Sequence, residues 1–321
     1  MLYILLFLLS FTLTYLIKNY AIKKAFYDIP NERSSHTVAT PHGGGIAIAF
    51  TWFIGIIYLY YTNDIDNSLF FTLISGGIII STVSYLDDLY DLSPKIRLFI
   101  QAFVAILGLY FLGGFKELNL FFFTIENQFI LTLFAFLMIV WFINLYNFLD
   151  GIDGYAGSEA IFLGLGGLIF FGGSHFLVLI AAVLGFLFWN WHKAKIFMGD
   201  VGSTLLGYNI AIFTIYYSNE ASNNFWIWIA LFSAFWFDAT YTLYKRYRNG
   251  EKLSQAHKKH AYQRLTQSGW SHEKVSLALI RLNTVLFLLV YLLGVHVTTI
   301  LLLFFILYTS IKFINRQKDF A

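Results

Sequence analysis

The sequence predicts an all-α polytopic membrane protein, and two features of the chain lead to this prediction. Its 321 residues are 58% hydrophobic and only 12% charged, far from the composition of a soluble domain. The apolar residues also gather in about eleven runs, and a helix that crosses a bilayer needs about 20 mainly apolar residues. In chain order the runs cover residues 1–17, 45–61, 69–86, 98–115, 129–148, 158–172, 174–191, 202–218, 224–244, 275–293 and 296–313.

The residues at the ends of the runs indicate where helices begin. The first run has no basic start and no small-residue cleavage site, so it is expected to remain as a helix rather than to be removed as a signal peptide. The fourth helix is predicted to begin after Ser93, a favourable N-cap, with Pro94 as its first residue. The sixth and seventh runs are tightly joined at residues 172–174 (GGS), so the helix count is open there. Residues 1–321 are expected to form one membrane-embedded domain, because no linker interrupts them.

The basic residues predict the orientation of the chain. Nineteen of the 21 Lys and Arg residues fall on one side of the predicted helices, whereas Lys116 lies opposite and Arg281 lies within the tenth run. Cytoplasmic loops of membrane proteins carry an excess of Lys and Arg. The N-terminus is therefore expected outside, the C-terminus in the cytoplasm, and the polar motifs on the cytoplasmic face. The chain has no cysteine, which excludes disulfides and thiolate metal sites.

The most unusual polar stretch, residues 144–154 (NLYNFLDGIDG), follows the fifth run. It contains Asn144, Asn147, Asp150 and Asp153 and no basic residue. Carboxylates this close together repel one another unless a cation or a proton lies between them. Its glycines allow a tight turn and a close approach to a ligand. The stretch is therefore predicted to form the floor of a site that handles a metal and phosphate.

A second acidic loop joins the third and fourth predicted helices. Asp87 and Asp88 are expected at the C-terminal end of one helix, where the helix dipole disfavours anions. Lys95 and Arg97 are expected in the first turn of the next helix, where the dipole disfavours cations. Both placements are explained if a metal binds the carboxylates and a phosphate binds the cations. The alternative is a surface cluster whose charges neutralise one another.

Two more loops on this face carry candidate ligand-binding residues. Asp200 could simply cap the eighth helix, but two other acidic loops on the same face favour a metal ligand. Residues 43–45 are three glycines that open the second helix and would expose backbone N–H groups to an anion. Arg33, His36 and His42 lie nearby and support this reading, to which a flexible joint is the alternative.

The long loop 245–274 contains two histidines and an arginine at helical spacing. His257, His260 and Arg264 lie at positions i, i+3 and i+7, which would share one face of a helix. A zinc site is not expected, because no third ligand of suitable type and spacing accompanies the histidines. A face that grips a diphosphate fits better, with ordinary positive-inside bias as the alternative.

Together these motifs resemble the polyprenyl-phosphate N-acetylhexosamine-1-phosphate transferases, the MraY- and WecA-type membrane enzymes of glycosyltransferase family 4. The resemblance covers nearly the whole chain. It rests on Asp87-Asp88, on the Asn144–Gly154 pattern, on residues 197–203 (FMGDVGS) and on the His257-x-x-His260 loop.

The resemblance implies an activity and a role for each motif residue. Such enzymes move a sugar-1-phosphate from a UDP-N-acetylhexosamine to undecaprenyl phosphate, release UMP and use Mg²⁺ or Mn²⁺. Asp200 and Asn147 are expected at the metal, Asp87 is the candidate base with Asp88 beside it, and a covalent phosphosugar on an aspartate is the competing proposal. Asp150 and Asp153 would hold the site together. The expected substrate-binding residues are Asn144, Asn147, Asn190, Lys95, His257, His260 and Arg264, with Asp153 and Asn190 towards the uridine.

The loop sequence HKKHAYQR at 257–264 differs from the histidine-rich loops of the MraY and WecA types. It looks more like the WbpL/WbcO-like branch, which starts O-antigen or related surface glycans of the lipopolysaccharide type. This departure argues against a MurNAc-pentapeptide donor and leaves GlcNAc, FucNAc and QuiNAc open. The expected location is the bacterial inner membrane. No nucleic-acid partner is expected. A homodimer is an expectation for the oligomeric state.

Two other classes of protein are alternatives to this transferase. A Mg²⁺-dependent intramembrane prenyltransferase needs Asp-x-x-x-Asp spacings on two helices, and here only Asp87 and Asp91 match once. A membrane transporter would carry its polar residues near the middle of its helices, whereas here they cluster at the cytoplasmic ends.

Overall fold

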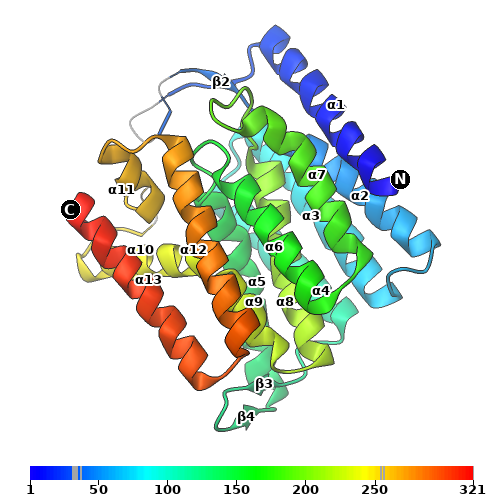
Figure 1. The fold of residues 1–321 in the computed structure, drawn as a ribbon. Helices are drawn as coiled ribbons and strands as arrows, with labels where there is room; N and C mark the ends of the chain where they lie inside the picture. Colours follow the sequence, from blue (N-terminus) through cyan, green and yellow to red (C-terminus); the bar gives the residue numbers. More distant parts are fainter. Residues whose placement is uncertain (31–34, 37, 254, 256, 321) are drawn as a thin grey trace.

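The computed structural model describes residues 1–30, 35, 36, 38–253, 255 and 257–320. These residues form an all-α protein with two short hairpins, β1 (Tyr27–Asp28) with β2 (Thr40–Pro41) and β3 (Leu118–Asn119) with β4 (Thr124–Ile125) (Figure 1). The helices are α1 Leu2–Lys24, α2 Gly45–Tyr61, α3 Asn67–Tyr90, α4 Pro94–Leu112, α5 Gln128–Phe148, α6 Tyr155–Phe171, α7 Ser174–Asn190, α8 Asp200–Glu220, α9 Asn224–Leu231, α10 Ser233–Arg248, α11 Ala261–Gln267, α12 His272–Leu293 and α13 Val297–Gln317.

The helices are those of a membrane protein. By length and composition, α1, α3, α4, α5, α12 and α13 can each cross a membrane, and α2, α6 and α7 are apolar but shorter. Each predicted run except the ninth corresponds to one helix. The glycines between the sixth and seventh runs separate two helices. Gly172 and Gly173 both have positive φ, which glycine adopts without strain. The ninth run is broken at Phe232 into α9 and α10, and the Ser233 hydroxyl there donates to the Ala230 carbonyl.

Helix α8 forms the centre of the bundle. Every residue from Val201 to Ile215 is buried, and α8 packs against α2, α3 and α5. Small residues allow these helices to approach closely. A Cβ added at Gly207 would lie 2.5 Å from the Phe142 carbonyl oxygen of α5. Because Asp200 is the first residue of this central helix, the packing brings it among the ends of α3, α4 and α5.

Two of the three glycines of residues 43–45, Gly44 and Gly45, serve packing rather than anion binding, which corrects the prediction for these two. The N–H groups of Gly44 and Gly45 donate to the carbonyls of Phe197 and Met198, at 2.9 and 2.8 Å. A Cβ at Gly45 would lie 2.3 Å from the backbone nitrogen of Gly202. The start of α2 is therefore pressed against the start of α8, which leaves neither a flexible joint nor free N–H groups at these two glycines. Arg33, predicted nearby, lies outside the described residues.

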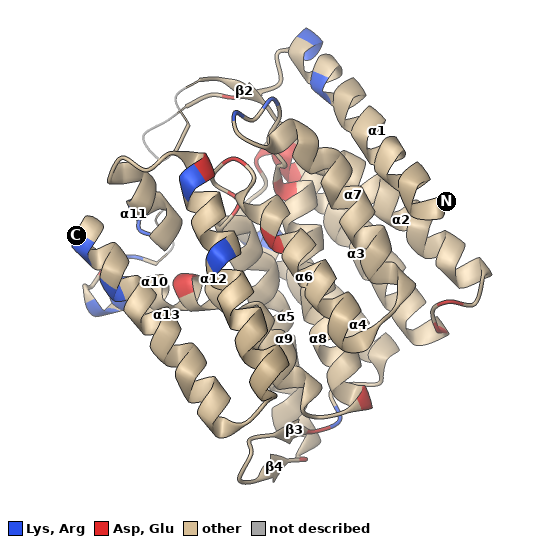
Figure 2. Ribbon diagram, viewed as in Figure 1, with Lys and Arg blue, Asp and Glu red and all other residues tan. Residues whose placement is uncertain are grey.

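Charged residues gather at one end of the bundle (Figure 2). The acidic residues of the loops before α6 and α8 lie at this end, whereas the long middle parts of most helices carry no charge. The candidate site lies within this charged end.

Candidate active site

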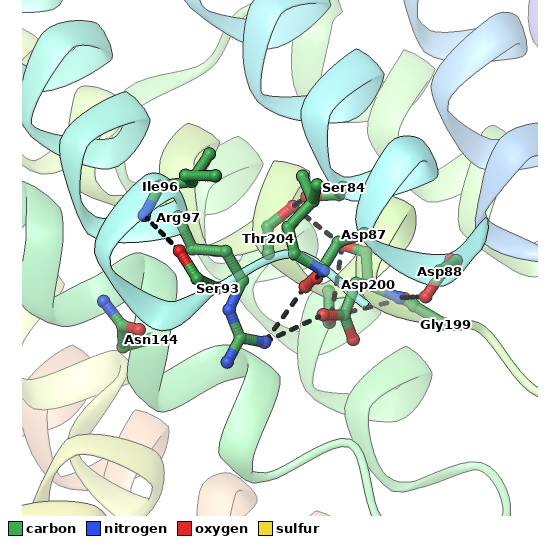
Figure 3. Close-up of polar contacts among 12 residues, drawn as sticks. Ser84, Asp87, Asp88, Ser93, Ile96, Arg97, Asn144, Gly199, Asp200 and Thr204 are labelled. Atoms are coloured by element: carbon green, nitrogen blue, oxygen red, sulfur yellow. Dashed lines mark hydrogen bonds and ion pairs between the residues drawn. The ribbon is translucent and has the colours of Figure 1, made fainter. Parts of the chain in front are cut away.

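The site is built around four aspartates and one arginine from different elements. Asp87 and Asp88 lie in the last turn of α3, and Asp200 is the first residue of α8. Nη1 of Arg97, on α4, lies 3.0 Å from Oδ2 of Asp87 and 4.0 Å from Oδ2 of Asp200 (Figure 3). On the other side, the backbone N–H of Asp200 donates to Oδ1 of Asp88 at 3.4 Å. Two carboxylates that are distant in the sequence, Asp87 and Asp200, thus lie beside one guanidinium, and Asp88 contacts the backbone of Asp200.

The short connection between α3 and α4 explains why Asp87 meets Arg97. Helix α3 ends at Asp91, which has a left-handed conformation, and the backbone N–H of Leu92 donates to Oδ1 of Asp87 at 2.7 Å. Helix α4 begins at Pro94, as predicted, and the Ser93 hydroxyl accepts the Ile96 N–H. The two helix ends therefore face each other. The charges of Asp87 and Arg97, each unfavourable at its own helix end, are paired with each other. Lys95 remains exposed and lines neither cavity described below.

Asp150 and Asn147 join the cluster from the end of α5. Asn147 lies beside Asp200, and both residues line the two cavities described below. Burial raises the pKa of Asp150 well above its ordinary value, and the nearby carboxylates of Asp200 and Asp88 raise it further. The cluster thus contains more carboxyl groups than Arg97, its one cation among the described residues, could balance if all of them were ionised.

The donors of this cluster fit a hard divalent cation. Oδ2 of Asp88 is buried and has no hydrogen-bond partner among the described residues. It lies 3.1 Å from the position of a Cβ added at Gly199, whose φ is +76°, so glycine is needed there. Mg²⁺ prefers oxygen ligands, and Asp88, Asp150, Asp200 and Asn147 supply carboxylate and amide oxygens. These are the residues that could hold such an ion.

Two cavities meet at this cluster. The first, of about 520 Å³, is bounded by α3, α4, α5, α10 and the loop before α11, and most of its lining is apolar. The second, of about 450 Å³, is bounded by polar loops and includes His36, His42 and Ser203. Asn147, Asp200 and Gln263 line both. The acidic cluster therefore stands where an apolar space and a polar space join.

The predicted asparagines have structural partners as well as places at the cavities. Asn144 lines the first cavity, and its Nδ2 donates to Oε1 of Gln101 at 2.6 Å. Asn190 lines the second cavity, but its Oδ1 accepts the Gly154 N–H and its Nδ2 donates to the Ile196 carbonyl, both at 3.0 Å. Asn190 thus ties the loop before α6 to the loop before α8.

Asp153 is separated from the other four aspartates. Its carboxylate lies 3.1 Å from Nδ1 of His192 and 3.1 Å from Nδ1 of His272, and it accepts the Ala194 N–H. Although burial opposes the change, the hydrogen bonds from His272, Ala194 and His192 lower the pKa of Asp153. Asp153 lines neither cavity. It fastens loops together, and with the two histidines it forms the one further group among the described residues that could hold a metal.

The predicted face of His257, His260 and Arg264 does not form. Helix α11 begins only at Ala261, so both histidines precede it, and the Gln263 side chain caps the His260 N–H. Both histidines line the first cavity, whereas Arg264 points away and donates to Oδ1 of Asn315 on α13. The helical spacing was misleading because the helix starts too late to contain all three residues.

Several residues of the site were not selected from the sequence. Gln101 and Arg246 line the first cavity, and Gln263 lines both. His192 and His272 hold Asp153. The position of His192, two residues after the predicted site residue Asn190, could have indicated its role. No local sequence pattern distinguishes Gln101 and Gln263 from other glutamines.

Known proteins resemble this chain over most of its length. A family model described as Glycosyl transferase family 4 matches residues 70–218. A probable undecaprenyl-phosphate N-acetylglucosaminyl 1-phosphate transferase of Bacillus subtilis is 34% identical over 277 residues, which cover 81% of this chain and 75% of the relative. The chain belongs to glycosyl transferase family 4. Undecaprenyl-phosphate alpha-N-acetylglucosaminyl 1-phosphate transferases of Yersinia pestis and Escherichia coli K12 are each 29% identical, over 92% and 83% of the chain and 84% and 76% of the relatives.

The family 4 match contains the acidic cluster. Residues 70–218 run from α3 to the end part of α8 and include Asp87, Asp88, Asp150 and Asp200. The resemblance to MraY- and WecA-type transferases, drawn from these motifs, is thereby confirmed. The loop with His257 and His260 lines the first cavity of this family 4 protein. It follows the matched segment and therefore lies outside the family model.

Proposed function

We propose that this protein transfers an N-acetylhexosamine-1-phosphate from a UDP-sugar to undecaprenyl phosphate and releases UMP. The observation that carries the proposal is the acidic cluster at the junction of an apolar and a polar cavity. Such a junction suits a reaction between a lipid-borne phosphate and a water-soluble nucleotide sugar. The names of the family relatives support undecaprenyl phosphate as the acceptor.

In this proposal the two cavities receive different substrates. The first has apolar walls, including Leu98 and Leu243, and contains the cation Arg97. It would take the phosphate end of the polyprenyl chain. The second is polar and would take the nucleotide sugar. The reacting phosphates would then meet beside Asp200 and Asn147, which line both spaces.

Mg²⁺, or Mn²⁺, would be held by Asp200 and Asn147, with Asp88 and Asp150 beside them. When bound, the ion supplies the positive charge that neutralises the donor diphosphate during transfer. The unpartnered oxygen of Asp88 and the raised pKa of Asp150 support this assignment, since neither side chain has a positive partner within the described part of the chain.

The reaction would proceed as a phosphoryl-type displacement. An oxygen of the lipid phosphate bonds to the phosphorus that carries the sugar, and the bond from that phosphorus to the oxygen of UMP breaks. Arg97 orients the lipid phosphate, and Asp87, which Arg97 contacts at 3.0 Å, accepts its proton if it arrives protonated. A covalent phosphosugar on an aspartate is the competing route.

We further propose eleven membrane-spanning segments, with the N-terminus outside and the site on the cytoplasmic face of a bacterial inner membrane. The break in the ninth run does not alter this number, because α9 and α10 together would form one broken span. The distribution of Lys and Arg supports the orientation.

The donor sugar is proposed to be GlcNAc or one of its deoxy relatives FucNAc and QuiNAc, used to start an O-antigen-like surface glycan. The names of the relatives favour GlcNAc. The sequence of the loop at His257–Arg264 favours the WbpL/WbcO-like branch, because it lacks a run of adjacent histidines.

UMP release by purified protein tests the proposal. The assay combines undecaprenyl phosphate, Mg²⁺ and a panel of UDP-N-acetylhexosamines, with Asp87→Asn and Asp200→Asn in parallel. Asp64→Asn, an exposed aspartate in the α2–α3 connection, is the control. We expect UMP only when lipid and metal are both present, a loss of at least about 100-fold in both site variants and none in the control. Activity that survives Asp200→Asn would exclude the metal assignment, and silence of folded protein across the panel would contradict the proposed donors.

A further inference from the structure

The loop between α10 and α11 is held from within by Arg246, in the last turn of α10. We propose that Arg246 is a positioning residue, which fixes His257 and His260 at the wall of the first cavity. The inference rests on the proposed function, because that function gives the loop its part in substrate binding. Arg246 is only 2% exposed, whereas Arg248, on the same helix, is exposed.

Four of the five N–H groups of Arg246 are used by this loop. Nε donates to Oε2 of Glu251 at 3.0 Å. Nη2 donates to the carbonyls of Lys252 and Gln255, at 2.7 and 2.9 Å. Nη1 donates to the Leu253 carbonyl at 3.3 Å. The planar guanidinium has its donors in a fixed arrangement, so these partners are held in a fixed relation to one another.

The far end of the loop is fixed by the same helix. Both carboxylate oxygens of Asp238 accept the Ala261 N–H at 2.9 Å, and the Thr242 hydroxyl donates to Oδ1 of Asp238. Asp238, Thr242 and Arg246 lie at positions i, i+4 and i+8 and therefore share one face of α10. One helix face thus anchors both ends of the segment that carries the two histidines.

The anchored loop also sets how His257 can bind. Its Nδ1 accepts the Lys259 N–H at 3.2 Å, so in the neutral ring the proton lies on Nε2. Burial lowers the pKa of His257 to about 4, and the nearby His260 and Arg246 contribute. The His257 ring lies 4.9 Å from that of His260, and both line the first cavity. The loop therefore presents a neutral N–H donor whose direction depends on Arg246.

A double-mutant cycle tests whether Arg246 acts through His257. Arg246→Lys keeps the charge but loses the planar guanidinium. Arg248→Lys is the matched control, since among the described residues Arg248 bonds only to the hydroxyl of the exposed Tyr244. We expect Arg246→Lys to lower kcat/KM for undecaprenyl phosphate by about tenfold to hundredfold, because the histidines line the cavity assigned to this substrate and a small displacement of a binding group has such effects. Combined with His257→Ala, it should cause no further loss. Multiplying effects, or an unchanged kcat/KM, would overturn the inference.

Limited trypsin digestion of the intact protein in detergent supplies a readout that does not depend on activity. Trypsin cuts after lysine, and Lys252 and Lys258 lie in the loop. Cleavage at these sites, followed by mass spectrometry, should be at least about tenfold faster in Arg246→Lys than in Arg248→Lys or the wild type, since loop opening exposes them. Equal rates would overturn the inference. Faster cleavage of Arg246→Lys, combined with a wild type that releases no UMP, would refute the proposed function and leave the anchoring intact.

Discussion

Asp150 shows how strongly the fold concentrates negative charge on individual residues. Burial and the neighbouring Asp200 and Asp88 hold its pKa well above the ordinary value, and one oxygen of Asp88 has no hydrogen-bond partner in the described ranges. Both features have the same physical origin, a group of carboxylates with one arginine to balance them. A bound divalent cation would relieve both at once.

This charge state predicts a pH-dependent response to metal. Because the folded protein raises the pKa of Asp150, it holds a proton more readily than the unfolded chain does. In metal-free solution this residue therefore destabilises the fold as the pH rises above the ordinary carboxyl pKa. We expect Mg²⁺ to raise the melting temperature in detergent by at least about 2 °C at pH 8 and by less at pH 5. Scanning fluorimetry would measure both values.

Two variants make this measurement specific. Asp150→Asn should be more stable than the wild type at pH 8 without Mg²⁺ and should lose most of the response to the ion. Asp64→Asn, exposed and distant from the cluster, should respond like the wild type. An Mg²⁺ response of equal size at both pH values, or an unchanged response in Asp150→Asn, would contradict the assignment.

At the scale of elements, the contact between α5 and α8 determines how the site is assembled. Helix α5 ends just after Asn147, and α8 begins at Asp200. Gly207 allows the two helices to touch, since an added Cβ would lie 2.5 Å from the Phe142 carbonyl oxygen. The obstructing atom belongs to the backbone, so it cannot move aside as the end of a flexible side chain can.

Gly207→Ala should therefore separate the two helices and disturb the meeting of Asn147 and Asp200. We expect a loss of about 1–3 kcal/mol in stability from overpacking, seen as a lower melting temperature, together with reduced UMP release. Gly157→Ala, on α6, is the matched control because the nearest atom to its new Cβ is the end of the Leu187 side chain at 3.0 Å. If both variants lost the same stability and activity, the α5–α8 contact would not be decisive.

At the scale of the whole molecule, the charged end of the bundle and its opposite end should lie on different sides of the membrane. Most Lys and Arg residues lie towards the end of the bundle that carries the acidic cluster (Figure 2), whereas Lys116 directly precedes the hairpin of β3 and β4 at the opposite end. Because the chain has no cysteine, single cysteines can be introduced without removing any.

Labelling of intact cells with a membrane-impermeant maleimide tests this orientation. Lys116→Cys should be labelled from outside, whereas Lys252→Cys, in the loop beside the site, should react only after the membrane is permeabilised. Both positions are exposed, so a difference in labelling reflects sidedness. The reverse pattern would place the acidic cluster outside and would contradict a cytoplasmic active site.

The sequence by itself determined the helices and the chemical character of one end of the bundle. Apolar length predicted the segments, and Ser93 and Pro94 predicted the start of α4, because both signals depend on neighbours along the chain. The presence of Asp87, Asp88, Asp150 and Asp200 at helix ends was likewise visible, and the structure brings these four together.

Only the tertiary structure decided which polar groups are free and which are already used. Asp153 belongs to the same motif as Asp150, yet its carboxylate is paired with His192 and His272 from other segments and does not join the cluster. Gly44 and Gly45 have their N–H groups bonded to the loop before α8, and Arg264 turns to α13. Local sequence sets where a side chain starts, but its partners come from segments that meet only when the helices pack. Hydrogen-bonding capacity at the site is therefore a property of the assembled bundle.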